Sequence, residues 1–228
     1  MTDVILLTHG SPDIRARTAA QMFARAVEAR APALRLHVAA LDHGLSLTDV
    51  CLSLSASGTL RATVVPAFVS SAHHVRVDVP AAVALAGNLS SVVLRTTATL
   101  GVSPALLGAL DRLLPDGPVV AAVAGTSDRQ AQAELDTLAL RWAERRGAPV
   151  VVGHASQGEP WIGDAITELE AATGRRAAIA ALVLFPGHLP DRITAAAAGR
   201  VVTPALSTLP EAVDLVLDRL RDAPGRAA

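Results

Sequence analysis

The fold is decided by a short segment near the start of the chain, which reads Val4-Ile5-Leu6-Leu7-Thr8-His9-Gly10-Ser11. An apolar run, a turn of small residues and then a helical pattern predict a buried strand that leads into a helix. The second half begins in the same way, with Val119-Val120-Ala121-Ala122-Val123-Ala124-Gly125-Thr126-Ser127. The chain therefore contains two copies of one strand-turn-helix plan.

Further pairs of segments support the duplication. Pro66-Ala67-Phe68 leads to His74, and Leu184-Phe185-Pro186 leads to His188. Both halves close on the residues Leu-Asp-Arg-Leu, at 110–113 and at 217–220. A chain of 228 residues can hold two small domains. We predict that they meet at the turn-forming segment 114–118, which gives domains 1–115 and 116–228.

Apolar runs and helical patterns alternate along both halves. Strands are expected near residues 3–8, 34–41, 62–69 and 91–96, and again near 118–124, 149–153, 179–185 and 200–203. Helices are expected near 14–30, 46–57, 77–86 and 103–114, and again near 128–146, 160–172, 190–198 and 208–222. This alternation predicts an α/β fold with two similar domains, each a four-stranded, mostly parallel sheet with helices on both faces. Two such copies also imply an active-site cleft between them.

The composition excludes several classes of protein. A formal net charge of −1 gives no general basic surface, so we expect no nucleic-acid partner. The single cysteine, Cys51, excludes an internal disulfide and any thiolate or iron–sulfur cluster held by this chain alone, and it fits a buried position on a helix. No apolar run reaches membrane-spanning length and no signal peptide is recognised, so we expect a cytoplasmic protein without membrane contact. All of the basic residues are arginine, whose planar fork suits an anionic ligand.

Histidine and aspartate residues follow the strands expected in the first half. They are His9, Asp42, His43, His73 and His74. Parallel strands present their carboxyl ends at one edge of a sheet, where ligands bind. Imidazole and carboxylate together suit a borderline divalent metal, and imidazole also transfers protons near neutral pH. In the second half His188 matches His74, whereas Gly125 is read as standing where His9 would.

Several of these segments carry a resemblance to a known family. They are Thr8-His9-Gly10-Ser11-Pro12-Asp13, His74-Val75-Arg76-Val77-Asp78-Val79-Pro80 and Phe185-Pro186-Gly187-His188-Leu189-Pro190-Asp191-Arg192-Ile193. Together with the duplication, they make the chain similar to the sirohydrochlorin chelatases, the class II tetrapyrrole metal chelatases, in their two-domain form. The resemblance runs along nearly the whole chain.

The resemblance implies roles for particular residues. His9 and His74 match the two histidines that act in catalysis and hold the incoming metal, and Asp42 joins them where the family usually has glutamate. Substrate binding is assigned to Ser11, Arg15, His73, Arg76, His188 and Arg192. The participation of His43, His73 and His188 stays open, and Asp191 is expected to cap or fix its loop. No cofactor is permanently bound, since the divalent metal is a substrate.

The activity that the resemblance implies is the insertion of Fe²⁺ into sirohydrochlorin to give siroheme. Iron is preferred because siroheme is needed more widely than corrin, and cobalt insertion for cobalamin synthesis is the alternative. Two readings belong to other classes: a non-catalytic carrier of tetrapyrrole or metal, and a histidine phosphatase. The phosphatases have arginine directly before the histidine, where this chain has Thr8. We expect a monomer or a weak homo-oligomer, and the metal used in vivo stays open.

Overall fold

A computed structural model describes residues 1–70 and 74–223, except the side chain of His74. The chain forms two compact units. Unit 1 contains residues 1–101 and the C-terminal segment that begins at Pro210, and unit 2 contains residues 102–209. Each unit is an α/β structure built on its own parallel sheet, so the predicted fold class is confirmed.

The sheet of unit 1 has four parallel strands in the order β2-β1-β3-β4. The strands are β1 (Thr2–Thr8), β2 (Leu34–Ala40), β3 (Arg61–Pro66) and β4 (Val93–Thr96). Residues 4–7 of the central strand β1 are fully buried, because helices cover both faces of the sheet. The continuous apolar run at the start of the sequence is therefore explained by its central position.

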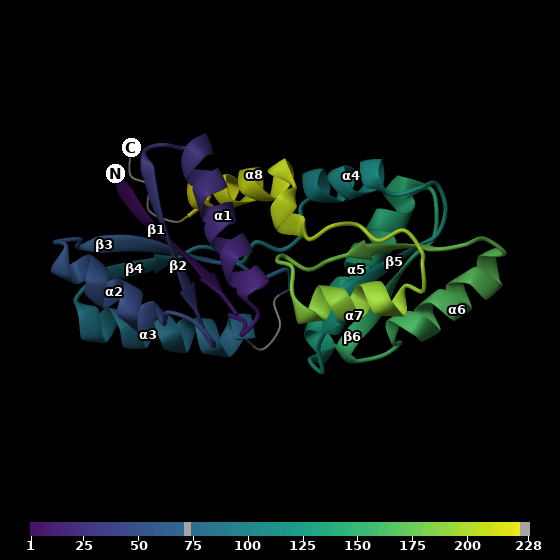
Figure 1. Cartoon of the computed structure of the whole chain (residues 1–228), viewed down its shortest axis with the longest axis horizontal. Helices are drawn as coiled ribbons and strands as arrows, with labels where there is room; N and C mark the ends of the chain where they lie inside the picture. The colour runs from purple at the N-terminus through teal and green to yellow at the C-terminus, as the bar shows by residue number, and fades with distance from the viewer. Residues whose placement is uncertain (71–73, 224–228) are drawn as a thin grey trace. The chain divides into compact units, whose positions relative to one another are not determined.

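Two helical layers cover the first sheet (Figure 1). α1 (Ile14–Arg30) and α8 (Pro210–Arg221) pack together over one face. The other face is covered by α2 (Leu47–Ala56) and α3 (Val79–Ser90), and the π-helical segment η1 (His74–Asp78) leads directly into α3. Because strand side chains alternate between faces, Ile5 and Leu7 both enter the core under α2 and α3. Cys51 lies in that core, so its predicted burial on a helix is confirmed.

The sheet of unit 2 has three parallel strands in the order β6-β5-β7, namely β5 (Val119–Gly125), β6 (Val150–Gln157) and β7 (Ala178–Ala181). The core beneath this sheet takes residues from α6 (Ile162–Thr173) and α7 (His188–Ala196). The remaining helices are α4 (Pro104–Leu113), α5 (Arg129–Arg146) and the short 3₁₀ turn η2 (Leu206–Thr208). The fourth strand predicted near 200–203 is wrong, because only Val202 forms a bridge, with Ile179.

The two units exchange their last helices. α4 ends the first sequence repeat but belongs to unit 2, and α8 ends the second repeat but belongs to unit 1. The chain therefore passes between the units after Gly101 and again after Leu209. The boundary between residues 115 and 116 divides the repeated sequence, and as a domain boundary it stays a prediction.

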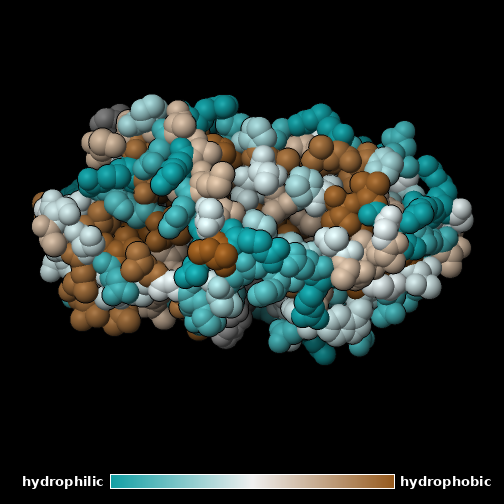
Figure 2. All heavy atoms as spheres, in the orientation of Figure 1, coloured by the Kyte–Doolittle hydropathy of each residue, from teal (hydrophilic) through white to brown (hydrophobic). Residues whose placement is uncertain are grey.

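The helical layers of the two units differ in surface character. Figure 2 shows apolar side chains gathered over α2 and α3, where Leu52, Leu85 and Leu89 are exposed. α6, which holds the place of α2 in the second repeat, instead exposes Asp164 and Glu168. Among the described helices, none has the length and apolar character needed to cross a bilayer. The repeats therefore share a backbone plan but differ in surface chemistry.

Candidate functional site

The carboxyl edge of the first sheet gathers the segments that the sequence singled out. β1 lies between β2 and β3, and all three strands are parallel. The segments that follow them therefore emerge at one edge. His9 directly follows β1, Asp42 comes shortly after β2, and the helical segment that His74 begins follows β3.

Backbone hydrogen bonds hold the segments of His9 and Asp42 side by side. The amide of Asp42 donates to the carbonyl of His9 over 2.8 Å, and the amide of Leu41 donates to the carbonyl of Thr8 over 3.0 Å. Gly10 makes this approach possible, because its φ is +93° and a Cβ there would lie 1.5 Å from the Asp42 carbonyl oxygen. An exposed imidazole and an exposed carboxylate thus come from adjacent loops.

His43 lies against the carboxylate of Asp42. Its Nε2 is 3.2 Å from one carboxylate oxygen, and its backbone amide donates to the other over 2.9 Å. Both side chains are more than half exposed, at 54% for His43 and 59% for Asp42. The sequence left the part of His43 open; in the structure its ring and its backbone amide both contact the Asp42 carboxylate.

The segment after β3 carries His73 and His74. His73 lies outside the described residues, and of His74 only the backbone is described, as the first residue of η1. The start of this segment is fixed by the Ala67 amide, which donates to the Leu7 carbonyl over 2.8 Å. π-helical turns occur often at functional sites. Because only the backbone of His74 is described, the placement of its imidazole beside His9 stays a prediction.

Ser11 and Arg15 both stabilise the start of α1. The Ser11 hydroxyl accepts a hydrogen bond from the Asp13 amide over 3.1 Å, and the Asp13 carboxylate caps the helix through the Arg15 amide over 2.9 Å. The same carboxylate binds the Arg15 guanidinium, with a shortest distance of 2.6 Å. Asp13 is only 9% exposed, whereas half of the Arg15 side chain is exposed. The charge of Arg15, assigned to substrate binding, is therefore already matched by Asp13.

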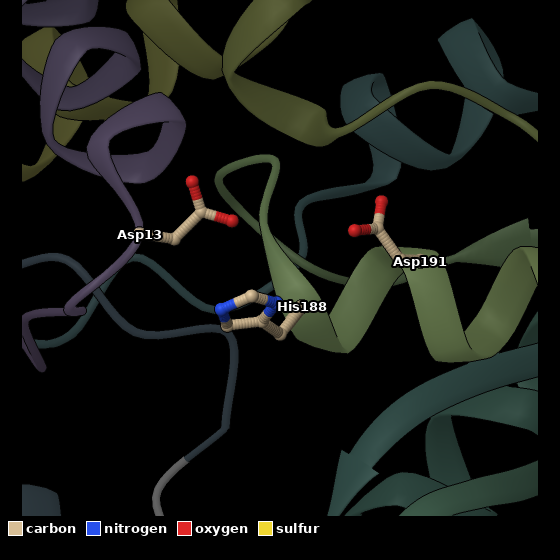
Figure 3. A group of neighbouring side chains, drawn as sticks. All are labelled: Asp13, His188 and Asp191. Atoms are coloured by element: carbon tan, nitrogen blue, oxygen red, sulfur yellow. The ribbon is translucent and has the colours of Figure 1, made fainter.

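His188 and Asp191 share the first turn of α7 in unit 2. Figure 3 draws them there, and draws Asp13 in unit 1 on the segment that leads into α1. A ring nitrogen of His188 and a carboxylate oxygen of Asp191 lie within 4.8 Å of one another, and both residues are exposed. Gly187, the N-cap residue of α7, has no side chain to cap the helix, and the expected part of Asp191 in capping or fixing this loop stays a prediction. The signal in the sequence was the spacing of three residues, which puts both groups on one helical face.

The assigned arginines outside α1 are both exposed. Arg76 lies in η1, and Arg192 follows Asp191 in α7. Each lies on a segment that follows a strand of its own sheet, β3 for Arg76 and β7 for Arg192.

The structure aligns the second repeat with the first one residue away from the alignment predicted from the sequence. The Thr126 hydroxyl accepts from the Asp128 amide over 3.0 Å, as Ser11 does from Asp13. Gly125, with a φ of +102°, approaches the carbonyl of Gln157 as Gly10 approaches that of Asp42. Gly125 therefore corresponds to Gly10 and not to His9.

It follows that Ala124 occupies the place of His9 and Gln157 the place of Asp42. Neither residue supplies the imidazole or carboxylate that a borderline divalent metal prefers. The sequence suggested that the repeats share metal-binding residues unequally. In the structure, the positions that match His9 and Asp42 both lack an imidazole or a carboxylate in the second repeat.

Two other histidines, His37 and His154, lie within the strands. His37 lies 2.8 Å from the carboxylate of Asp3, which also binds the Arg35 guanidinium at 2.6 Å. Hydrogen bonds from Arg35, His37 and Thr59 outweigh burial and lower the pKa of Asp3 to about 2. His154 is 3% exposed in β6, and burial lowers the pKa of its imidazole.

A family model describes this repeated arrangement. The model of CbiX matches residues 3–116 and matches again over residues 118–223. The chain belongs to the CbiX family. No match is found among curated proteins.

Solved structures related to the CbiX family share the fold. SirB from Bacillus subtilis with Fe³⁺ has a TM-score of 0.78 at 19% identity, covering 97% of this chain and 95% of that one. The sirohydrochlorin chelatase SirB from Bacillus subtilis subspecies spizizenii, in complex with cobalt, has a TM-score of 0.74 at 18% identity over the same shares. A CbiX described as the terminal enzyme for biosynthesis of siroheme in denitrifying bacteria has a TM-score of 0.69 at 19% identity, covering 99% of this chain and all of that one. At such identities the likeness shows a common fold.

Proposed function

We propose that this chain inserts a divalent metal, Fe²⁺ in the first instance, into sirohydrochlorin. Membership of the CbiX family supports the reaction class, and structural relatives are described as a sirohydrochlorin chelatase and as an enzyme of siroheme biosynthesis. The observation that carries the proposal is the contact between the His9 and Asp42 loops at the exposed carboxyl edge of the first sheet. That contact joins the backbones of two residues whose exposed side chains are an imidazole and a carboxylate.

The reaction makes two demands that these side chains can meet. The metal must be held and then released, and two protons must leave the ring nitrogens of the tetrapyrrole. Imidazole and carboxylate bind borderline ions, and an exposed site with an incomplete ligand set leaves positions for exchange. His9 and His74 are proposed as ligands and as proton acceptors near neutral pH. Holding metal and ring together converts an encounter reaction into a local one.

The carboxylates on the rim of the tetrapyrrole require cations. We assign this role to the exposed Arg76 and Arg192, because guanidinium groups bind carboxylates through paired hydrogen bonds. His188, with Asp191 on the same turn, is proposed as a further polar contact to the substrate. Arg15 is assigned a smaller part, since Asp13 already binds its guanidinium.

The choice of iron over cobalt rests on the wider need for siroheme. Cobalt remains the second candidate metal, because a related SirB was solved in complex with it. The cytoplasmic location and the monomeric or weakly associated state remain predictions from the sequence. Parallel rate measurements with Fe²⁺ and Co²⁺ decide between the metals.

The test is an anaerobic insertion assay followed by absorbance. Purified sirohydrochlorin is mixed with Fe²⁺ or Co²⁺ and with the wild-type chain, His9→Ala or His74→Ala. Each variant is expected to fold normally and to lose about 100-fold in rate, the scale of one lost general base or metal partner. His37→Ala is the matched control, because that histidine binds Asp3 within the sheet and is expected to leave insertion unchanged.

Each other outcome has a defined meaning. Near-normal rates in both His9→Ala and His74→Ala would remove these residues from the mechanism. A spectral shift without accelerated insertion by the wild-type chain would indicate a carrier. Turnover of phosphate esters that chelators leave unaffected would indicate a histidine phosphatase.

A further inference from the structure

A hollow of about 570 Å³ lies in unit 2, away from the residues discussed above. It is lined by Glu170, Gly174, Arg175, Arg176, Ala198 and Arg200. Arg175 and Arg176 directly precede β7, and Arg200 precedes the bridge residue Val202. The hollow therefore lies at the amino ends of the strands, whereas His188 lies beyond the carboxyl end of β7. The proposed chelatase chemistry uses none of these residues.

One arginine of the hollow has a purely structural role. Arg200 binds the Glu170 carboxylate with two hydrogen bonds, of 2.8 and 2.7 Å, and donates a third to the Ala197 carbonyl. The Ala177 amide also donates to Glu170 over 2.8 Å. These bonds hold the pKa of Glu170 down at about 2. The ion pair forms one wall of the hollow, and Glu170, the only carboxylate of the lining, is already bound to Arg200.

Arg175 and Arg176 are the two arginines of the lining that do not pair with Glu170 through hydrogen bonds. Each donates one hydrogen bond to a backbone carbonyl, Arg175 to Asp116 over 3.0 Å and Arg176 to Gly199 over 3.1 Å. Within the described part of the chain, neither guanidinium has a carboxylate within ion-pair distance. A guanidinium has five N–H donors, so each arginine keeps most of its donors for a ligand. Three arginines against one glutamate give the lining two net positive charges.

Both guanidinium groups are held in position before any ligand arrives. Arg175 lies over Gly117, where an added Cβ would come within 3.1 Å of a guanidinium nitrogen. The turn that presents the Gly199 carbonyl to Arg176 contains Ala198 at a φ of +46°, a strained conformation for a residue other than glycine. Fixed donors lose less conformational entropy when they bind, and a planar fork matches the oxygens of carboxylate and phosphate.

We propose that this hollow binds a small oxyanion ligand with at least two negative charges, either a phosphate or a polycarboxylate. The two exposed arginines supply the recognition, and the Arg200–Glu170 pair supplies the rigid wall. Within unit 2 the hollow lies at the amino ends of the strands, whereas His188 follows the carboxyl end of β7. The hollow therefore offers a place where an anionic metabolite is bound without entering the reaction.

Isothermal titration calorimetry at low ionic strength tests the proposal. The full chain is titrated separately with inorganic phosphate and with citrate, against sodium chloride of equal ionic strength. Removing both arginines in R175Q/R176Q should weaken binding by about tenfold or more, because hydrogen bonds to charged groups are lost. The double variant R25Q/R141Q, which replaces two exposed arginines outside the hollow, is a control with the same change in net charge.

Saturable binding that is lost in R175Q/R176Q and kept in R25Q/R141Q supports the site. Preference for phosphate or for citrate then identifies the ligand class. Equal binding by wild type and R175Q/R176Q, equal weakening in both double variants, or no saturable binding of either anion overturns the proposal. Thermal unfolding followed by circular dichroism verifies that the variants are folded.

Discussion

At the residue scale, Gly10 determines how closely the two loops of the candidate site approach each other. Its positive φ and its contact with the Asp42 carbonyl leave no room for a side chain. Gly58 is a natural comparison, because its φ is +81° but nothing lies within 4 Å of the position of an added Cβ. The two glycines therefore separate backbone strain from steric contact.

We expect Gly10→Ala to lower the free energy of unfolding by about 3 kcal/mol and Gly58→Ala by about 1 kcal/mol. Only Gly10→Ala should also slow metal insertion, since it pushes the Asp42 loop away from His9. Urea denaturation and the insertion assay measure the two effects. Equal losses of stability in both variants would show that the contact with Asp42 has no energetic weight.

Asp3 provides a pH-dependent prediction at the same scale. Its pKa is about 2 in the folded chain against an ordinary value of 3.8, so its stabilising effect is complete above pH 4 and is lost as the pH falls toward 2. Asp3→Asn should therefore lower the free energy of unfolding by about 2 kcal/mol at neutral pH, and by progressively less below pH 4. Urea denaturation at several pH values measures the difference. A difference that does not shrink at low pH would contradict the assigned ion pair.

The residues of the site were partly predictable. Placing His9 and Asp42 after buried strands was enough to expect them at one sheet edge, because parallel strands share that edge. The offset of one residue in the second repeat was not predictable in this way, since the segments around Ala124-Gly125 and His9-Gly10 match in two registers. The hydrogen bonds of Ser11 and Thr126 decide the register, and they form only in the folded chain.

At the scale of elements, most helices and strands begin and end close to the predicted residues. Helix α1 matches the prediction at both ends because Asp13 caps its start and Pro32 follows its end. The prediction of a fourth strand in unit 2 was wrong because a short apolar run such as 200–203 fits the pattern of a strand without determining which strand it pairs with. The π-helical form of η1 also has no signature in the sequence.

The repeated residues Leu-Asp-Arg-Leu give a test at this scale, because the two copies act differently. Asp111 in α4 accepts hydrogen bonds from Trp142, Arg145 and Arg146 of α5, at distances of 2.7 to 2.8 Å. Asp218 in α8 forms an exposed pair with Arg221, one turn away. The same residue type thus joins two helices in one unit and is largely solvated in the other.

Asp111→Asn should lower the free energy of unfolding by about 2 kcal/mol, since hydrogen bonds to a charged group are weakened. The matched change Asp218→Asn should cost less than about 0.5 kcal/mol, because surface pairs contribute little. Thermal unfolding of both variants makes the comparison. Similar shifts in the two variants would mean that the link between α4 and α5 does not stabilise unit 2.

At the scale of the whole molecule, the exchange of α4 and α8 is the feature that the sequence did not reveal. Both helices carry the same four residues in their last turns and both have an apolar face, so the sequence pattern alone is compatible with either helix in either unit. The difference lies in the partners. Trp142 of α5 binds Asp111 of α4, whereas Arg219 of α8 donates to the Thr99 and Leu100 carbonyls of unit 1.

We therefore expect the fragment 102–209 to fold more stably than the fragment 116–228. The first retains α4 on α5, whereas the second carries α8, which has its own partners in unit 1. Circular dichroism melts of the two purified fragments make this comparison. A cooperative transition in 116–228 and none in 102–209 would instead favour the sequence boundary between residues 115 and 116 as the domain boundary.

Metal insertion at the edge that carries His9 and Asp42 is tested most sharply by the dependence of the insertion rate on metal concentration, measured by anaerobic stopped-flow absorbance with sirohydrochlorin and Fe²⁺. The wild-type chain should accelerate insertion above the spontaneous rate and saturate with metal. Asp42→Ala should need about tenfold more metal to reach half its maximal rate, because one ligand beside His9 is lost. No acceleration by the wild-type chain would rule out the proposed reaction, and identical saturation curves for the two proteins would exclude Asp42 as a metal ligand.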